Sequence, residues 1–343
     1  MKVAVVILNW NGRKYLERFL PEVIEYSKDH AEVIIADNAS SDDSITYLNQ
    51  NYPDIRVIQF PINYGFAAGY NKAFEQVESD YYILLNSDMQ VTPNWIPPVI
   101  SLMEKDPMIA ACQPKIRAFH EPDKFEYAGA AGGFIDKYGF PFCRGRMFQS
   151  IEADEGQYDD AIEVFWATGA CMFVRADVYH KMGGLDDDFF AHMEEIDFCW
   201  RLKNNGYKVM FCPSSTVFHI GGGTLPKNNA EKTYLNIRNN IIMLYKNIQP
   251  GMLIPVFIAR VMLDYIASIK FLIDGGFSDL WAVNRAHFYF WRNFRRLRKK
   301  REKIVHRKVS NIYWGNIAFE HYIHRRKYYS QLDPAKFTGN HSQ

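Results

Sequence analysis

The sequence predicts an α/β fold, in which a mostly parallel, Rossmann-like sheet is flanked by helices and followed by a helical C-terminal extension. Short apolar runs alternate with segments of helical periodicity in the first ninety residues or so. The apolar runs end in clusters of polar residues. From Ala230 onward, helical spacing is the pattern that remains.

The first half of the chain contains four predicted strands, at 3–8, 33–36, 55–60 and 81–85. Apolar residues recur at helical spacing between them, beginning with Tyr15, Leu16, Phe19 and Leu20. Strands that alternate with helices imply right-handed crossovers and a parallel sheet covered on both faces.

Each predicted strand runs directly into a polar cluster. The clusters are Asn9 to Asn11, Asp37 to Asp42, Asn63 to Gly65, and Asn86 to Asp88. Because the carboxyl ends of parallel strands share one edge of a sheet, we expect all four loops to converge on one crevice, where such folds bind ligands.

The middle of the chain, 117–164, is rich in glycine and aromatic residues and has no clear period. We expect irregular loops there, with 152–160 the most mobile segment. Order returns with strands at 170–174, 207–211 and 216–219 and with helices at 176–182 and 194–204. We therefore expect one domain over 1–247 and an extension over 248–343.

Composition limits the class of protein. The 343 residues are 48% hydrophobic and 23% charged, and the formal net charge of +1 argues against a globally basic nucleic-acid binder. The five cysteines contain no CxxC pair, and the chain runs from Met1 into a strand. We expect no signal peptide, unpaired thiols and a reducing cytosolic setting.

Three carboxylates, those of Glu194, Glu195 and Asp197, lie within four residues at a predicted helix start. Acidic residues there complement the helix dipole, and Asp197 can pair with Arg201 one turn later, which is a purely structural explanation. Glu195 points away from that pair, so it remains available for acid or base chemistry beside Glu194.

His219 follows the last predicted strand and precedes Gly221, Gly222 and Gly223. A single histidine is more often structural, but glycines let a bound group approach the backbone closely. One carboxylate, one imidazole and diphosphate oxygens would suit Mn²⁺ or Mg²⁺.

These residues resemble family 2 glycosyltransferases of the GT-A fold, and within them a subgroup similar to bacterial rhamnosyltransferases. The resemblance covers about 3–246. It rests on Leu8-Asn9-Trp10-Asn11-Gly12, Ala36 to Asp42, Asn63 to Asn71, Leu85-Asn86-Ser87-Asp88, Gly169-Ala170-Cys171, Glu194 to Phe198, and His219.

The resemblance implies a role for each matching position. Nucleotide-binding positions are Asn9, Asn11, Asp37, Asn38, Ser40 and Asp42, with Asp37 accepting from the base and the segment from Gly65 to Asn71 closing over the nucleotide. Asn86-Ser87-Asp88 takes the place of the DXD signature, so that Asp88 would bind a divalent cation and Asn86 would contact the ribose or a metal-bound water. His219 would complete the metal site. Glu194 and Glu195 stand for an acidic pair whose second member is usually the base.

Two departures from the family pattern stand out. Glu195 is one methylene longer than the usual aspartate, and Asn86 carries no charge. The expected reaction is an inverting, metal-dependent transfer of a sugar from a nucleoside-diphosphate sugar to a glycan or lipid-linked saccharide acceptor, as in the synthesis of cell-surface polysaccharides.

Two alternatives belong to other classes. A sugar-phosphate nucleotidyltransferase should carry a Gly-rich phosphate loop after the first strand, and Asn9 to Arg13 is not such a loop. A membrane or nucleic-acid adaptor built on an inactive domain fits the tail but leaves Asp88, Glu195 and His219 unexplained. Donor hydrolysis that depends on Mn²⁺ would separate the enzyme from the adaptor.

The extension raises a membrane question. The segment 252–273 is apolar, but Arg260, Asp264 and Lys270 would each cost roughly 2.5 to 3.5 kcal/mol at a bilayer centre, which favours an interfacial or docking helix. The basic segment 291–301 follows. It suits a solvated helix, nucleic acid or anionic lipid, and we favour lipid at the cytoplasmic face of a bacterial inner membrane, with no nucleic-acid partner.

Overall fold

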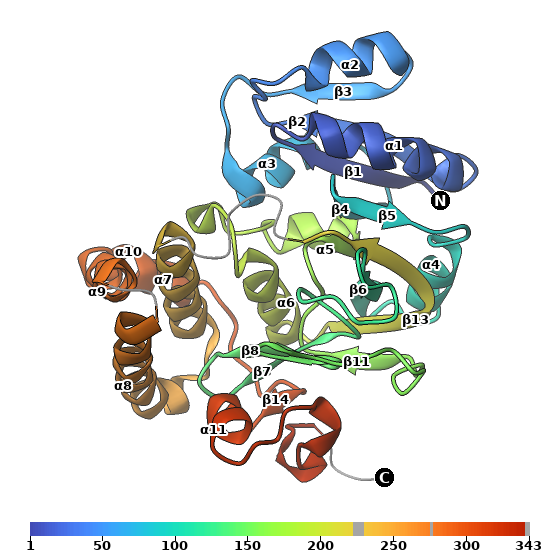
Figure 1. Ribbon diagram of the computed structural model, residues 1–343. Coiled ribbons are helices and arrows are strands. Elements are labelled where there is room, and N and C mark those ends of the chain that lie inside the picture. The colour runs from blue at the N-terminus through green and yellow to red at the C-terminus, as the bar shows by residue number, and fades with distance from the viewer. Residues whose placement is uncertain (222–229, 275–276, 340–343) are drawn as a thin grey trace.

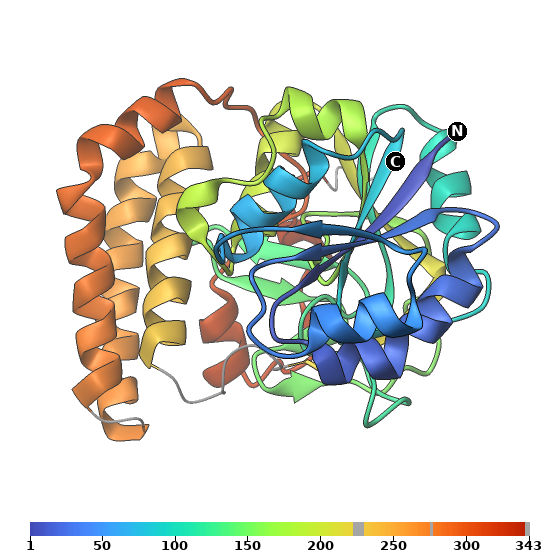
Figure 2. The ribbon, with the colours of Figure 1, turned by 90° about the horizontal axis from the view of Figure 1, so that it is seen from above.

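The computed structural model describes residues 1–221, 230–274 and 277–339. Gly222 and Gly223 therefore lie outside the described residues. The main sheet has the order β11-β13-β6-β12-β4-β1-β2-β3, and β5 pairs with β13 at one end. Helices lie on both sides of it, and α7–α10 are grouped at the left of both views (Figures 1 and 2).

The first half of the sheet is parallel, as predicted. It consists of β1 (Val3–Asn9), β2 (Glu32–Asp37), β3 (Arg56–Gln59) and β4 (Tyr81–Asn86), connected by α1 (Arg13–Ser27), α2 (Ser44–Asn51) and α3 (Gly65–Phe74). In this register Asn9 pairs with Asp37, and Leu8 pairs with Asn86. The polar ends of these strands are therefore neighbours.

The second half adds β5 (Met89–Val91), β6 (Ile109–Ala118), β11 (Ile162–Val164), β12 (Cys171–Arg175) and β13 (Lys208–His219). Strand β12 runs antiparallel between β4 and β6, so its amino end meets the carboxyl end of β4. The two strands expected at 207–211 and 216–219 form one strand, because an irregularity between Cys212 and Thr216 lets β13 continue along β6.

Alternation along β4 divides the core into two layers. Tyr81, Ile83 and Leu85 pack in a cluster with α1, α2 and α4 (Pro97–Glu104). Tyr82 and Leu84 pack on the other face with α3, α5 (Ala176–Lys181), α6 (Glu194–Asn204) and α7 (Ala230–Asn247). The sheet is thus covered on both faces, as predicted.

The middle segment was predicted wrongly as irregular. It forms most of a second, five-stranded sheet, whose strands are β7 (Gly133–Asp136), β8 (Pro141–Cys143), β9 (Arg146–Met147), β10 (Ser150–Ile151) and β14 (Ile312–Tyr313). The segment expected to be mobile, 152–160, is tied down by ion pairs from Lys115 and Arg117 to Asp154 and by the buried ring of Tyr158.

The C-terminal extension contains α8 (Pro250–Asp274), α9 (Phe277–Arg292), α10 (Phe294–Glu302) and α11 (Ile317–Tyr322). It is not purely helical as expected, because β14 adds an edge strand to the second sheet beside β7. Short 3₁₀ turns at Tyr329–Gln331 and Pro334–Lys336 follow. All five cysteines are free and buried, in line with the expected unpaired thiols.

Candidate active site

The carboxyl ends of β1 and β2 carry a buried polar cluster. The side-chain amide of Asn9 donates to Asp37 at 3.0 Å and to the Ser40 hydroxyl at 3.1 Å. Asp37 also accepts hydrogen bonds from the Ser40 hydroxyl at 2.6 Å and from the Ser40 backbone N–H at 3.0 Å. Three of the residues predicted for nucleotide binding therefore form one preorganised group at the predicted edge of the sheet.

Asn11 and Asp42 shape the loops around this cluster. Asn11 has a positive φ of 52°, and its side-chain oxygen accepts from the backbone N–H groups of Ser41 at 2.7 Å and Asp42 at 3.3 Å. Partial burial would raise the pKa of Asp42, but hydrogen bonds from Ser44 and from the Arg13 backbone outweigh it and lower that pKa. Both side chains thus brace the loops after β1 and β2.

The third loop is fastened to the second by Asn38. The Asn38 side-chain amide donates to Asn63 Oδ1 and to the Gly65 carbonyl, both at 3.0 Å, and its oxygen accepts from the Tyr64 backbone N–H. Gly65 has a φ of +76°, and a Cβ there would lie 2.4 Å from the ring of Phe190. Glycine is therefore required where this loop meets the segment before α6.

Asn71 has a task that the sequence did not predict. Its amide donates to the Leu185 carbonyl at 2.8 Å and to Asp187 at 2.6 Å, while its oxygen accepts from the Tyr179 hydroxyl at 2.6 Å and the Leu185 backbone N–H at 3.0 Å. These four bonds use its full hydrogen-bonding capacity. The side chain therefore holds the 185–187 loop and is not free to contact a nucleotide.

Asp88 and His219 meet as predicted, although 131 positions separate them. Strand β5 pairs antiparallel with β13 and sets Met89 opposite His219, which brings Asp88 Oδ1 to 3.2 Å from His219 Nε2. On the other side of the ring, His219 Nδ1 lies 3.4 Å from Glu126 Oε2. Glu126 comes from the segment predicted to be irregular, and the sequence did not indicate it as a site residue.

Charge explains the protonation states of this group. Burial alone would lower the pKa of His219, but the negative charges of Glu126 and Asp88 raise that pKa to about 10. Burial would raise the pKa of Asp88, yet the hydrogen bond and positive charge of His219 lower it. The two groups therefore stabilise each other as an ion pair.

The Asp88–His219 pair could hold a divalent cation in place of the proton that the two groups share, because imidazole must lose that proton to bind a metal. Two ligands at right angles on an ion with bonds of about 2.1 Å stand about 3 Å apart, close to the observed 3.2 Å. Carboxylate oxygen and imidazole nitrogen are both accepted by Mn²⁺. Within the described residues no group of three or more acidic, histidine or cysteine side chains is arranged to hold a metal ion, so a cation here would take most of its ligands from water or a bound ligand.

Asn86 and Ser87 lie between the Asn9–Asp37–Ser40 cluster and the Asp88–His219 pair. The Asn86 backbone N–H donates to the Ala170 carbonyl at 2.9 Å, and the Ser87 hydroxyl lies 3.2 Å from the point where a Cβ on Gly12 would stand. Both side chains are half-buried. The turn after β4 thus lies next to the carboxyl end of β1 and the amino end of β12.

Glu194 and Glu195 open α6 next to the same turn. A Cβ on Gly169 would lie 3.6 Å from the Cβ of Glu195, and Gly169 precedes the residue that accepts from Asn86. Burial, reinforced by the charge of Glu195, raises the pKa of Glu194 well above its usual range. Burial also raises the pKa of Glu195 to about 7, against backbone N–H groups that lower it.

The two carboxyl groups differ in access. Glu194 is buried and Glu195 is partly exposed, and one oxygen of each has no hydrogen-bond partner in the described part of the protein. Asp197, by contrast, pairs with Arg201 at 2.9 Å as predicted and also with Lys246. Each glutamate therefore keeps one carboxylate oxygen that can still accept a hydrogen bond, whereas the carboxylate of Asp197 is occupied by its ion pairs.

The segment before α6 is held in an unusual backbone conformation. Phe190, His192 and Met193 all have positive φ angles, between 61° and 72°. The side-chain amide of Asn239 on α7 donates to the carbonyls of Phe189, Ala191 and His192 at 2.7–2.9 Å. Burial lowers the pKa of His192 to about 4, so its ring is neutral beside the glutamates.

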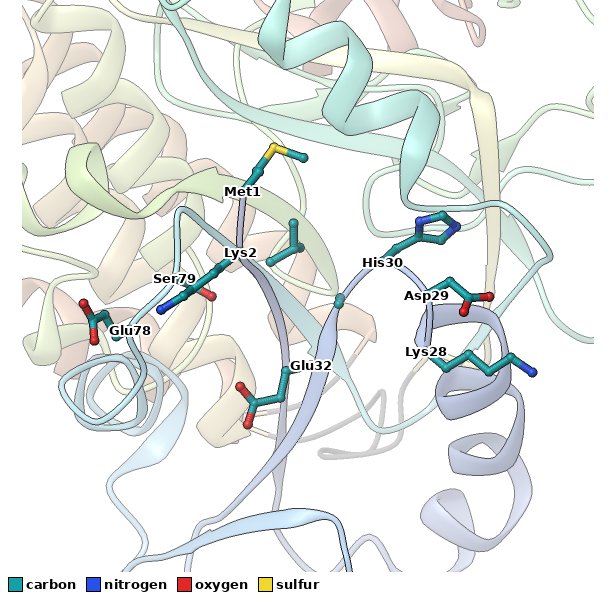
Figure 3. A pocket seen from close by; sticks show the side chains of 10 residues that line it. Met1, Lys2, Lys28, Asp29, His30, Glu32, Glu78 and Ser79 are labelled. Atoms are coloured by element: carbon teal, nitrogen blue, oxygen red, sulfur yellow. The ribbon is translucent and has the colours of Figure 1, made fainter.

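A hollow of about 260 Å³ lies elsewhere (Figure 3). It is lined by the starts of β1 and β2 and by the residues before β4, so it lies at the amino-terminal edge of the parallel strands. All the predicted site residues lie toward the other edge, which makes this hollow separate from the candidate active site.

A family model described as Glycosyl transferase family 2 matches residues 4–183. The chain is 27% identical over 235 residues to an N-acetylglucosaminyl-diphospho-decaprenol L-rhamnosyltransferase from Mycobacterium tuberculosis, over 63% of this chain and 75% of the relative. It is 23% identical over 228 residues to the rhamnosyltransferase WbbL from Escherichia coli, over 63% and 83% respectively.

Solved structures share the fold. GalNAc-T7 with UDP, GalNAc and Mn²⁺ superposes with a TM-score of 0.57 at 16% identity, over 72% of this chain, which spans only 48% of that protein. The mannosyltransferase PcManGT from Pyrobaculum calidifontis, in complex with GDP-Man and Mn²⁺, gives a TM-score of 0.50 at 12% identity, over 88% and 84%.

Proposed function

This chain belongs to glycosyl transferase family 2 and has the GT-A fold, and from that premise we propose that it is an inverting, metal-dependent enzyme. Its donor is a nucleoside-diphosphate sugar, and its acceptor is a hydroxyl of a glycan or lipid-linked saccharide. The observation that carries the proposal is the convergence of the Asp88–His219 pair and the Glu194–Glu195 pair on one sheet edge, through the loop that holds Gly169 and Ala170.

The donor site that we propose follows the polar edge of the sheet. Asn9, Asp37 and Ser40 would receive the base and ribose, with Asn11, Asn38 and Asp42 keeping the surrounding loops in place. Asn86 and Ser87 would face the diphosphate. Gly65 and Asn71 support this site indirectly, through Phe190 and the 185–187 loop.

Asp88 and His219 would hold Mn²⁺ or Mg²⁺, and a bound cation would neutralise charge that develops on the departing diphosphate. Glu126, whose carboxylate lies 3.4 Å from His219 Nδ1, would orient the ring from the side opposite the cation. The mannosyltransferase and GalNAc-T7 structures both contain Mn²⁺, which supports the choice of ion.

Glu195 is the base in this proposal. Its carboxylate would take the proton of the acceptor hydroxyl as the oxygen forms its bond to the anomeric carbon, and the bond from that carbon to the diphosphate breaks with its electron pair leaving on the nucleotide. Attack from the face opposite the leaving group inverts the anomeric configuration. A pKa near 7 matches a base that works at neutral pH, whereas burial and the neighbouring charge of Glu195 disfavour the charged form of Glu194 more strongly.

We further propose that the acceptor is lipid-linked and that the enzyme works at the cytoplasmic face of a bacterial inner membrane. The name of the mycobacterial relative includes a diphospho-decaprenol acceptor. One helix of the described residues, at 250–269, is long and apolar enough to cross a membrane by length and composition alone.

Thermal-shift measurements with UDP-, dTDP- and GDP-sugars, with and without Mn²⁺, test the donor class. We expect one nucleotide to raise the melting temperature and Mn²⁺ to increase that shift, because a ligand that binds the native state stabilises it by mass action. Asp88→Asn should keep the fold but lose the Mn²⁺-dependent part of the shift. No shift with any nucleotide would contradict the proposed activity.

A further inference from the structure

The polar side of α8 faces the body of the protein. Arg260, Asp264 and Ser268 are all buried. Arg260 donates to Asp264 at 2.8 Å, to the Tyr138 carbonyl at 3.1 Å and to Asn240, and it stacks over the ring of Phe140 at 4.0 Å. Two of the charges that made this helix unsuitable for lipid in the sequence, Arg260 and Asp264, are therefore satisfied inside the fold.

The outer side of α8 is apolar. Its large exposed side chains recur at helical spacing, and Ile254 and Ile266 are 70% and 64% exposed. The full row consists of Ile254, Ile258, Met262, Tyr265, Ile266 and Ile269. The side chains of Lys270 to Asp274 lie outside the described residues. A water-facing helix would show charge on this side instead.

Helix α9 adds four exposed aromatic residues, Phe277, Trp281, Phe288 and Trp291, each at least 58% exposed. Helices α8 and α9 are antiparallel neighbours, since Trp291 contacts Phe257 and His287 stacks on Tyr265. The opposite side of α9 packs through Ala282 and Ala286 against α7. Both exposed rows therefore lie on one outer face, which we name the α8–α9 plate.

Cations border the plate. Arg292, Arg295 and Lys299 are exposed, and none of them forms an ion pair with another described residue. Their neighbours have internal tasks: Arg296 and Lys300 pair with Asp188, and Arg301 donates to carbonyls at the end of α7. Only part of the basic segment is therefore available to a partner.

We propose that the α8–α9 plate docks on a lipid bilayer with anionic headgroups and lies in its interface. The plate supplies aliphatic side chains and tryptophans for the acyl boundary, and the free cations beside it match anionic headgroups. Helix α8 lies flat on the surface and does not span, because Arg260 near its middle is hydrogen-bonded to Tyr138 and Asn240 in the body.

This orientation rests on the proposed function and refines its acceptor. Helix α7 packs on α9 with one side and holds the carbonyls of 189–192 through Asn239. Packed helices are about 8 to 10 Å apart. Two helix layers, α9 and then α7, thus separate the headgroups from the segment that leads into Glu194 and Glu195, which places the proposed base on the membrane side of the protein, where a lipid-linked saccharide could reach it.

Flotation of the full chain with vesicles tests the surface. We expect binding to vesicles of phosphatidylcholine with phosphatidylglycerol and much weaker binding to phosphatidylcholine alone. Ile258→Glu combined with Trp281→Glu should abolish flotation, whereas Ile323→Glu, at an even more exposed isoleucine outside the plate, should not. Arg295→Glu and Lys299→Glu should each weaken binding by roughly fivefold or more.

Equal loss with Ile323→Glu, or equal binding to uncharged vesicles, would overturn the proposal. Sedimentation without lipid gives a further outcome: a dimer that the double variant dissociates would assign the plate to a second copy of the chain. Donor-induced thermal shifts of the same variants should equal those of the unmodified protein. If the unmodified protein showed no donor-induced thermal shift, the proposed enzymatic function would be refuted, and the docking result would be unaffected.

Discussion

Adjacent glutamates at the start of α6 have different environments, and this difference supports the roles that we propose for them. Glu194 is buried beside a like charge, whereas Glu195 is partly exposed next to Gly169. A base must reach its substrate and be deprotonated at the working pH. The partial exposure of Glu195 and its pKa of about 7 both support its proposed role as the base.

Replacing Glu195 by glutamine should reduce kcat by about 10²- to 10⁴-fold, the usual contribution of a general base. The donor should still bind, because the nucleotide loops are on other strands. Steady-state kinetics and calorimetric titration of the donor measure the two effects. Near-normal turnover with intact donor binding would exclude Glu195 as the base.

The pKa of Glu195 near 7 predicts a pH dependence of the rate. Glu195 must lose its proton to act, so kcat/KM should rise with pH through about 7 and level off above it. A pH–rate profile of the unmodified enzyme measures this limb. A flat profile between about pH 5 and 8 would contradict the assignment.

Stability should change in the opposite direction. Burial raises the pKa of Glu195 and of Glu194 above their unfolded values, so folding binds protons. The free energy of unfolding therefore falls as pH rises above the unfolded value of 4.5 and through the folded pKa values. Glu194→Gln should therefore raise the melting temperature at pH 8 and have little effect near pH 4. A lower melting temperature at pH 8 would show that the Glu194 charge is stabilising.

At the scale of the element, α7 links the active site to the C-terminal helices through two adjacent asparagines. Asn239 donates to three carbonyls of the segment before α6. Asn240 donates to the Gly139 carbonyl and accepts from Arg260 of α8. The helix thus fixes the strained backbone that precedes the glutamates.

Asn239→Ala should lower kcat/KM for the acceptor by about tenfold or more, because small displacements of catalytic groups are costly, while the donor dissociation constant stays unchanged. Asn284→Ala is the matched control, since the Asn284 amide donates to a carbonyl of its own helix. Kinetics with varied acceptor and donor concentrations separate the effect on kcat/KM for the acceptor from any effect on donor binding. Equal effects of both variants would remove the positioning role of Asn239.

At the scale of the whole molecule, the extension is part of the main core. Val256, Phe290, Leu297, Tyr313 and Phe337 belong to the same buried cluster as residues of β1 and β4. The rings of Phe337 and Tyr313 pack together, and Phe337 also contacts Phe134 on β7. The boundary expected at 247 therefore separates segments that share a core.

Phe337→Ala should lower the free energy of unfolding by about 3 to 5 kcal/mol, the usual cost of removing a buried aromatic ring. We expect one cooperative unfolding transition, because Phe337 shares a core with the N-terminal strands. Circular dichroism and donor protection followed in the same denaturant series measure it. Two separate transitions would show that the extension unfolds on its own.

The sequence by itself determined the parallel strands β1 to β4 and the polar edge at their carboxyl ends. Apolar runs located β1 to β4, and the residues that follow them, with Glu194, Glu195 and His219, mark the edge at which we propose the chemistry. These features are readable because strand period, helix period and motif spacing are local properties of the chain.

Only the tertiary structure decided what depends on distant partners. It assigned Asn71 to a loop, brought Glu126 to His219, built the second sheet from the middle segment and β14, and turned Arg260 and Asp264 inward. Helical periodicity separates the two sides of α8, but which side meets water follows from partners such as Tyr138 and Asn240, far away in sequence. Long-range packing, which local patterns do not encode, sets that choice.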